Sequence, residues 1–262
     1  MSKVDLNNIT NVVVVGKSGA GKQPRIDVLV NEFGLEQLST GDIFRSYLKK
    51  FNDYRYPGDL KAFWNSKENN FKPDNEIIQR LKTDDNDIVL GLKAKYFVDQ
   101  GLFVPDFITN ALFESYFAKK NFRNQILDGY PRTSEQSKFL LDLLQKNNSK
   151  IDFILLVDNE DERIIKRTIK RRICPKCGKV YHLEYRPPIN GKCECGEEVI
   201  QRSDDTKEKI TSRLKEFKEK ALPAINYLKN NGIPIITVPG HLEEFTAENV
   251  TKSVMDQIEI LC

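Results

Sequence analysis

The sequence lacks the features that would mark a membrane, secreted or nucleic-acid-binding protein. Its 41 Lys and Arg residues nearly balance 38 Asp and Glu residues, so no excess of positive charge points to nucleic acid or to an acidic membrane surface. It has no apolar run long enough to cross a bilayer, and residues 1–10 lack the pattern of a signal peptide. We therefore expect a cytoplasmic protein without membrane or nucleic-acid partners, and we also expect it to be a monomer.

Cysteine is scarce outside one short segment. Four of the five cysteines lie between Cys174 and Cys195, and Cys262 stands alone, which is a local cluster and not a disulfide framework. The first pair, Cys174 and Cys177, has the two-residue gap of a zinc knuckle, whereas Cys193 and Cys195 have only one residue between them. We expect these four cysteines to hold a structural zinc ion; reduced thiols without metal and a nucleic-acid-binding ribbon are the alternatives.

A glycine-rich loop follows the first buried-strand pattern of the chain. Residues 12–15 are consecutive valines, and they run into the segment Gly16–Lys22, which reads GKSGAGK. Its three glycines let the backbone turn so that successive N–H groups and the start of the next helix face an anion. Lys22 adds a positive charge for the outer phosphates of a nucleotide. The segment therefore predicts a phosphate-binding loop.

This loop also lacks a residue that the general pattern contains. A Ser or Thr for magnesium usually follows the lysine, but here the next residues are Gln23, Pro24 and Arg25. Pro24 has no backbone N–H, although proline fits sterically in the first turn of a helix. We expect the loop to bind phosphate with one donor fewer.

The remaining apolar runs indicate an α/β protein. Four apolar runs are typical of strands: residues 12–15, 125–127, 151–157 and 233–238. Amphipathic helical stretches separate these runs, and this alternation predicts a parallel sheet with helices on both faces. Residues 206–231 have helical spacing of apolar side chains and predict a surface helix that is interrupted near Pro223. Two segments do not follow this alternation of strands and helices, residues 49–87 and residues 173–202, and we interpret both as insertions.

Several short motifs follow the loop in a fixed order. They are Leu38–Arg45 (LSTGDIFR), Gly101–Asp106 (GLFVPD), Asp128–Gln136 (DGYPRTSEQ) and Arg202–Asp205 (RSDD). Together with the loop and the cysteine segment, they resemble the adenylate kinases. Any one motif is weak, but the ordered set is specific and covers nearly the whole chain except roughly residues 49–86.

The resemblance implies a three-layer P-loop kinase core of the α/β class with a parallel sheet. It also implies an inserted subdomain that binds the nucleoside monophosphate and a small lid that contains the cysteines. The expected division is core at 1–40, 105–172 and 203–262, monophosphate-binding subdomain at 41–104 with an aromatic insertion at about 49–86, and lid at 173–202.

The same resemblance implies reversible phosphoryl transfer from MgATP to AMP, giving two ADP. The transition state spreads negative charge over several oxygens, and arginine binds such oxygens bidentately while staying charged. The residues that the resemblance assigns to catalysis are Lys22, Arg45, Arg132, Arg171, Arg202, Arg213 and Asp128, the last of which would orient magnesium or its water ligands. The attacking phosphate oxygen is already an anion, so no general base is required, and the chain has only two histidines.

Two binding sites follow from the matched motifs. The expected ATP contacts are Gly16, Gly19, Ala20, Gly21, Lys22, Gln23, Arg167 and Gly240, with Arg167 beside the donor adenine. The expected AMP contacts are Thr40, Arg45, Val104, Gly129, Arg132 and Gln136. The carboxamide of Gln136 can both donate to and accept from one edge of adenine.

Other interpretations stay open. The departure at Gln23 and Pro24 allows an adenylate-kinase-like protein that binds nucleotides with weak or lost catalysis, although the intact arginines argue against it. A kinase for a different nucleoside monophosphate is disfavoured by Gln136 and permitted by the large insertion. The insertion has six aromatic residues, namely Phe51, Tyr54, Tyr56, Phe63, Trp64 and Phe71. We expect them to pack on the monophosphate-binding subdomain. The alternatives are a site for a partner or a remodelled acceptor pocket.

Overall fold

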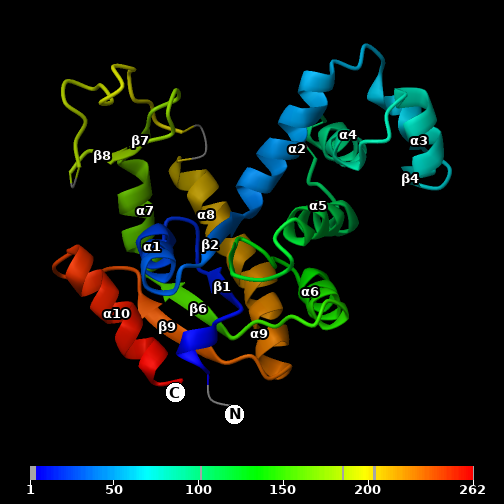
Figure 1. Cartoon of the computed structure of the whole chain (residues 1–262). Helices are drawn as coiled ribbons and strands as arrows, with labels where there is room; N and C mark the ends of the chain where they lie inside the picture. The colour runs from blue at the N-terminus through cyan, green and yellow to red at the C-terminus, as the bar shows by residue number, and fades with distance from the viewer. Residues whose placement is uncertain (1–3, 101, 185, 203–204, 262) are drawn as a thin grey trace.

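The centre of the protein is a sheet of five parallel strands in the order β2-β5-β1-β6-β9 (Figure 1). The strands are β1 (Asn11–Val15), β2 (Glu36–Ser39), β5 (Gln125–Asp128), β6 (Phe153–Asp158) and β9 (Ile235–Pro239). Because all five are parallel, their carboxyl ends lie at the same edge of the sheet. Ser39, Asp128 and Asp158 therefore come to one edge, where ligands bind in open α/β sheets.

The side chains of β1 alternate between the two faces of the sheet, and every residue of this strand is buried. Val13 packs in the core that includes α5 (Asp106–Ala118), α6 (Ser134–Lys146) and α9 (Leu222–Asn230). Val12 packs in the core that includes α1 (Lys22–Phe33) and α10 (Ala247–Glu259). Each fully buried valine contributes about 1.5–3 kcal/mol to folding. The helices on both faces give the three layers seen in Figure 1.

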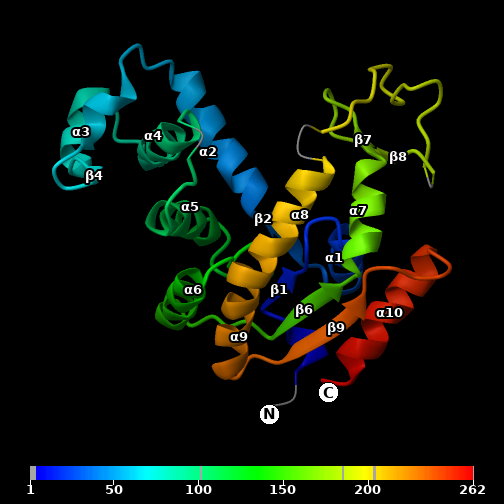
Figure 2. The ribbon, with the colours of Figure 1, turned by 180° about the vertical axis from the view of Figure 1, so that it is seen from behind.

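A helical subdomain extends away from the carboxyl edge of the sheet (Figures 1 and 2). It comprises α2 (Thr40–Tyr54), the 3-10 helix Leu60–Phe63, β3 (Trp64–Asn65), β4 (Asn70–Phe71), α3 (Asp74–Leu81) and α4 (Asn86–Val98). The ring of Trp64 stacks on Tyr96 of α4 with centroids 5.0 Å apart, and it meets Phe71 edge-on at 5.1 Å. The aromatic insertion thus packs on the subdomain, as expected.

The cysteine segment lies between two helices that pack against each other. Helix α7 (Asp161–Ile169) leads into the antiparallel pair β7 (Arg171–Ile173) and β8 (Val180–His182), and α8 (Lys207–Glu216) leads back to the core. Helix α8 continues through a π-helix at Phe217–Ala221 into α9. Figure 2 shows the segment above both helices, on the same side of the sheet as the helical subdomain.

The computed structural model describes residues 4–100, 102–184, 186–202 and 205–261, and it begins with a 3-10 helix at Leu6–Asn8. Gly101 of the GLFVPD motif and Ser203 and Asp204 of the RSDD motif lie outside the described residues. None of the helices described in these ranges is long and apolar enough to cross a membrane.

The α/β fold predicted from the sequence is confirmed. The four predicted strands occur as β1, β5, β6 and β9. Strand β2 was not predicted, because Leu38 is its only buried residue and it therefore has no apolar pattern. The predicted helix over 206–231 is interrupted just before Pro223, which lies in the first turn of α9.

Candidate active site

The phosphate loop connects β1 to α1 at the carboxyl edge of the sheet. Gly19 and Gly21 have φ values of 84° and 103°, a region in which a Cβ atom is strained. Gly240, after β9, packs so closely on the loop that a Cβ there would lie 2.0 Å from the carbonyl oxygen of Ala20. The turn and this close approach both require glycine, and Gly240, an expected ATP contact, lies beside the loop.

Lys22 is the first residue of α1, and its ammonium group lies inside the loop. Nζ donates a hydrogen bond to the carbonyl oxygen of Gly16 at 3.0 Å. Burial lowers the pKa of Lys22; the charge of Asp128 opposes this shift, and the positive charges of Arg132 and Arg171 add to it. The Lys22 ammonium therefore lies within the electrostatic reach of two other cations and one carboxylate. This arrangement favours a bound anion, because phosphate oxygens would relieve the repulsion.

The start of α1 accommodates the departure from the usual loop pattern. Pro24 is the third helical residue, where a backbone N–H would have no partner within the helix. The Gln23 carboxamide donates to Asp27 at 2.9 Å and to Oε1 of Gln37 at 3.0 Å. Gln37 in turn donates from Nε2 to Oδ2 of Asp128 at 3.0 Å. Gln37 thus links Gln23, at the position where other loops carry a hydroxyl, to the Asp128 carboxylate.

Several of the residues expected to contact AMP come from the segment after β5 and from α2. Arg132 donates from Nε to the carbonyl oxygen of Gly129 at 2.8 Å, and Thr40 donates from Oγ1 to the carbonyl oxygen of Asp128 at 3.0 Å. Arg45 lies further along α2, and its side chain is 71 % exposed. The structure therefore brings Thr40, Gly129 and Arg132 together and leaves Arg45 facing solvent.

Gln136 lies in the first turn of α6 and is only 5 % exposed. Its Nε2 donates to Oδ1 of Asp106 at 2.7 Å, and its Oε1 accepts from the backbone N–H of Arg132 at 2.8 Å. Oδ2 of Asp106 accepts from the hydroxyl of Thr133 at 2.6 Å. Val104, two residues before Asp106, packs against the core on this side of the sheet. No role of Asp106 was predicted from the sequence.

The arginines at the base of the cysteine segment approach the loop to different extents. Arg171 binds the fully buried Asp205 through two hydrogen bonds, 2.9 Å from Nε and 2.5 Å from Nη2. Arg213 lies with Nη1 3.5 Å from the hydroxyl of Ser18 in the loop. Arg202 is exposed, and its carbonyl oxygen accepts from the N–H of Asp205 at 3.0 Å. Arg213 thus approaches the loop directly, Arg171 is close enough for its charge to lower the pKa of Lys22, and Arg202 is exposed.

Arg167 belongs to a group of side chains that the sequence analysis only partly identified. Its Nη1 is so close to Gly21 that a Cβ there would lie 3.3 Å away. The Arg167 and Arg25 guanidinium carbons lie 5.9 and 5.2 Å from the ring centre of Phe245. Arg25 is fully buried and donates to the carbonyl oxygen of Pro239 at 2.5 Å, and burial lowers its pKa to about 10. No motif contains Phe245, so only the structure places it here.

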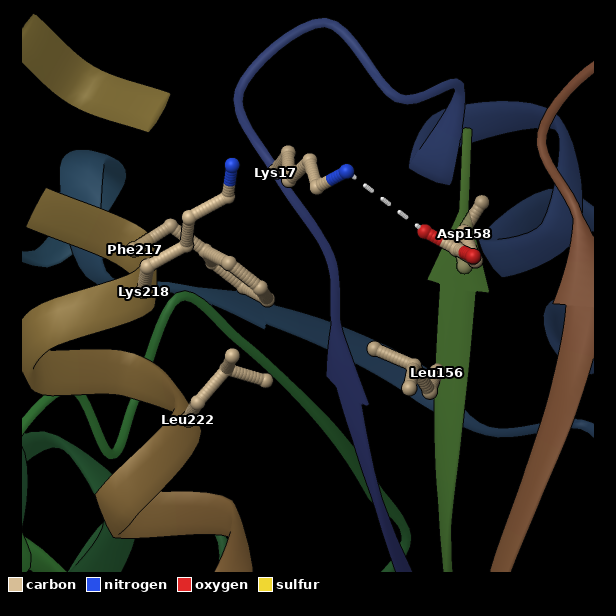
Figure 3. Close-up of a pocket in the computed structure, with 7 residues that line it drawn as sticks. Lys17, Leu156, Asp158, Phe217, Lys218 and Leu222 are labelled. Carbon is tan, nitrogen blue, oxygen red and sulfur yellow. Dashed lines mark ion pairs between the residues drawn. The ribbon is translucent and has the colours of Figure 1, made fainter. Parts of the chain in front are cut away.

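A small cavity of about 280 Å³ lies between the loop and the π-helix, lined by Lys17, Leu156, Val157, Asp158, Phe217, Lys218 and Leu222 (Figure 3). Beside it, Asp161 at the start of α7 pairs with Lys17 at 2.7 Å and with Lys218 at 2.8 Å. Hydrogen bonds from these two cations lower the pKa of Asp161. Asp161 therefore connects the loop to the π-helix.

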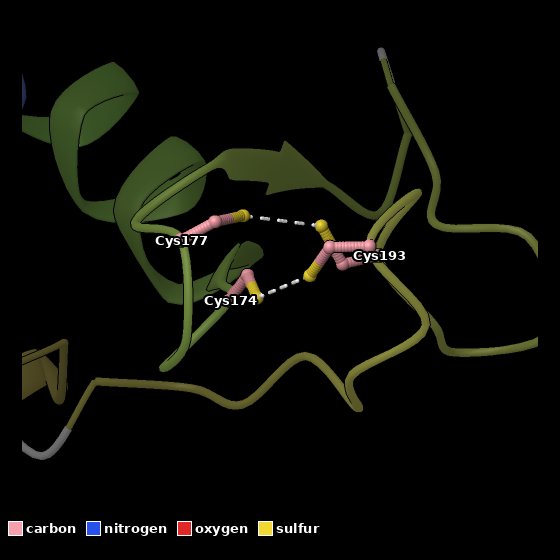
Figure 4. A group of neighbouring side chains, drawn as sticks. Cys174, Cys177 and Cys193 are labelled. Carbon is pink, nitrogen blue, oxygen red and sulfur yellow. Dashed lines mark hydrogen bonds between the residues drawn. The ribbon is translucent and has the colours of Figure 1, made fainter.

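The four clustered cysteines converge as the sequence predicted (Figure 4). Their sulfur atoms all lie within 4.8 Å of one another, and Cys174–Cys195 and Cys177–Cys193 are 3.5 Å apart. The backbone N–H of Cys195 and the hydroxyl of Tyr181 lower the pKa of Cys193 to about 6. Four thiolates at these separations fit the tetrahedral sulfur set of a structural metal site, so the one-residue gap between Cys193 and Cys195 does not prevent convergence.

Comparisons with known proteins agree with the motifs. The adenylate kinase family model matches residues 74–233 of this chain. An adenylate kinase of Acholeplasma laidlawii is 33 % identical over 253 residues, which cover 95 % of this chain and 98 % of the relative. An adenylate kinase of Symbiobacterium thermophilum is 32 % identical over 91 % of this chain and 95 % of the relative. One of Clostridium botulinum is 34 % identical over 85 % of this chain and 88 % of the relative.

Proposed function

Because this chain belongs to the adenylate kinase family and is therefore a nucleoside monophosphate kinase, we propose that it transfers a phosphoryl group reversibly from MgATP to AMP. The products would be two molecules of ADP. The observation that carries the proposal is the ammonium group of Lys22 inside the phosphate loop, with Asp128, Arg132 and Arg171 close enough for their charges to act on it. Such a site can bind two phosphate chains at once.

In the proposed reaction, an oxygen of the AMP phosphate attacks the γ-phosphorus of ATP. A new P–O bond forms while the bond to the β–γ bridging oxygen breaks, and ADP leaves from the donor. Charge moves onto oxygens that fixed cations can stabilise without reorganisation, so positioning and electrostatics supply the catalysis. We assign the donor phosphates to Lys22, the acceptor phosphate to Arg45 and Arg132, and the donor and transferred phosphates to Arg171, Arg202 and Arg213.

Asp128 would face the magnesium that accompanies ATP. Its carboxylate lies at the end of β5 near Lys22, and Gln37 holds one of its oxygens. A carboxylate is a ligand type that magnesium prefers, directly or through water. This role supports catalysis in a loop that has no hydroxyl after Lys22, and so it weakens the interpretation that Gln23 and Pro24 abolish activity.

Closure of the two flanking regions would complete the site. Arg45 and Arg202 are exposed in the described structure, and we propose that each meets its phosphate when the flanking regions close. We propose that residues 41–104 close over AMP and that residues 173–202 close over ATP. Closure also excludes water, which would otherwise hydrolyse ATP.

A zinc ion held by the four cysteines would stiffen the lid. The donor set contains no residue of the phosphate site, so we assign the metal a structural role only.

A panel of acceptors tests the proposal. The purified protein is mixed with MgATP and with AMP, CMP, UMP or GMP, and diphosphate formation is followed while binding of diadenosine pentaphosphate is titrated in parallel. The proposal expects AMP to be the preferred acceptor. Binding of the dinucleotide without turnover would contradict it in favour of a nucleotide sensor, and a preference for another acceptor would contradict the assignment of AMP.

A further inference from the structure

The carboxamide of Gln136 is held by two partners of opposite hydrogen-bonding character. The carboxylate of Asp106 can only accept, so it must face the NH₂ group of Gln136, and the two atoms are 2.7 Å apart. The backbone N–H of Arg132 can only donate, so it must face the carbonyl oxygen, at 2.8 Å. The partners therefore fix which end of the carboxamide is nitrogen, whatever a ligand would prefer.

Asp106 is itself held in place. Its second oxygen accepts from Thr133 at 2.6 Å, and Thr133 caps α6 by accepting from the backbone N–H of Gln136. Asp106 is the first residue of α5, so two helices and the segment after β5 meet in this network. Gln136 is 5 % exposed, which leaves its side chain little room to rotate.

We infer that Asp106 is a positioning residue that sets acceptor specificity by fixing the orientation of the Gln136 carboxamide. This inference rests on the proposed function, because it takes AMP as the acceptor. One N–H and one lone pair of the carboxamide stay available after the two internal hydrogen bonds are made. Adenine offers an N–H donor at its 6-amino group and an acceptor at N1.

Hypoxanthine and guanine present the reverse order on the same edge. They carry an acceptor at O6 and a donor at N1–H, so a bound carboxamide would have to turn by half a rotation to match them. In this chain that rotation would place the carbonyl oxygen of Gln136 against Asp106 and its NH₂ group against the N–H of Arg132. Two favourable hydrogen bonds would be lost. In their place an acceptor would face an acceptor and a donor would face a donor, and such contacts are unfavourable when they are buried. The site therefore accepts AMP and rejects 6-oxopurine monophosphates.

The test compares AMP with IMP, since the two bases differ only at the edge in question. The ratio of kcat/KM with AMP to kcat/KM with IMP is measured for the wild type and for Asp106→Ala, Asp106→Asn and Asp74→Ala. Asp74 is the matched control, because it is also the first residue of a helix and also follows a proline. Folding of each variant is checked by its thermal midpoint.

We expect Asp106→Ala to lower the AMP/IMP ratio by about tenfold, because only the N–H of Arg132 then still opposes rotation of the carboxamide. Asp106→Asn should lower it by a smaller factor, since one carbonyl oxygen can still face Gln136, and Asp74→Ala should leave it unchanged. Equal losses with both acceptors in Asp106→Ala would overturn the inference and leave Asp106 a purely structural residue. If Asp106→Ala does not fold, a wild-type ratio in folded Asp106→Asn would overturn it. A wild type that makes no ADP from AMP contradicts the proposed function instead.

Discussion

Gln37 donates a hydrogen bond from its carboxamide to the carboxylate of Asp128, with 3.0 Å between Nε2 and Oδ2. The Gln23 carboxamide supports Gln37 from the first turn of α1. The residue that replaces the usual neighbour of the loop lysine is thus connected to the carboxylate that we assign to magnesium. Gln23, which replaces the usual Ser or Thr, therefore still supplies a polar group on this side of the site.

Replacing Gln37 with Leu is expected to raise the apparent activation constant for magnesium by about tenfold, because Asp128 loses the donor that orients it. The measurement is a magnesium titration of ADP formation at fixed ATP and AMP, and the KM for AMP should stay unchanged. Gln145→Leu, at an exposed position of α6, is the control. An unaltered magnesium dependence in Gln37→Leu would show that this hydrogen bond has no part in metal use.

Lys22→Ala and Arg132→Ala are each expected to lower kcat by at least about 10³-fold, because each removes a cation from the point where charge develops. Neither side chain belongs to the hydrophobic core, so thermal midpoints should change by only a few degrees. Turnover is measured with saturating MgATP and AMP. Substantial activity in either folded variant would contradict the role assigned to that residue.

Asp161→Asn is expected to lower stability at pH 7 by about 1 kcal/mol, because Lys17 and Lys218 lose their shared carboxylate. These cations lower the pKa of Asp161 in the folded protein, so its contribution is present above the unfolded pKa of about 4 and is lost as the pH falls through the folded pKa. Thermal midpoints of the variant and wild type should differ by a constant amount from pH 7 to pH 5. The difference should then shrink below about pH 4. Asp256→Asn, in an exposed pair on α10, should show little difference at any pH.

Metal analysis of the purified protein is expected to give about one zinc per chain, because four thiolates complete a tetrahedral site. Chelation should release the metal and lower the thermal midpoint, and Cys177→Ser should have the same effect. Cys262→Ser is the control, since this cysteine is far from the cluster in the sequence. A protein that contains no zinc and is indifferent to chelators would contradict a metal-holding lid.

Much of the fold was predictable because the relevant signals are local. The four consecutive valines, Val12 to Val15, have the pattern of a strand that is buried on both faces of a sheet, and the glycines that follow them define the loop. Strand β2 was missed because it has a single buried residue and depends on pairing with β5. Its register puts Ser39 beside Asp128, which no property of the segment alone indicates.

The residues of the candidate site were also only partly predictable from the sequence. Motif residues such as Lys22, Asp128 and Gln136 were identified from the sequence, and the structure brings them to one edge of the sheet. Their supporting residues were not, because the contacts join distant parts of the chain. Gln37 is 91 residues from Asp128, and Asp106 is 30 residues from Gln136. Contacts between residues so far apart cannot be predicted from the spacing of residues along the sequence.

The most direct test of the account is a phosphorus NMR spectrum of the purified protein with MgATP and AMP. We expect the γ-phosphate signal of ATP and the AMP signal to decline together while two ADP signals grow, and we expect added ADP to regenerate both starting nucleotides. Spectra in which ATP and AMP stay unchanged, with enzyme that is folded and binds diadenosine pentaphosphate, would contradict phosphoryl transfer by this site.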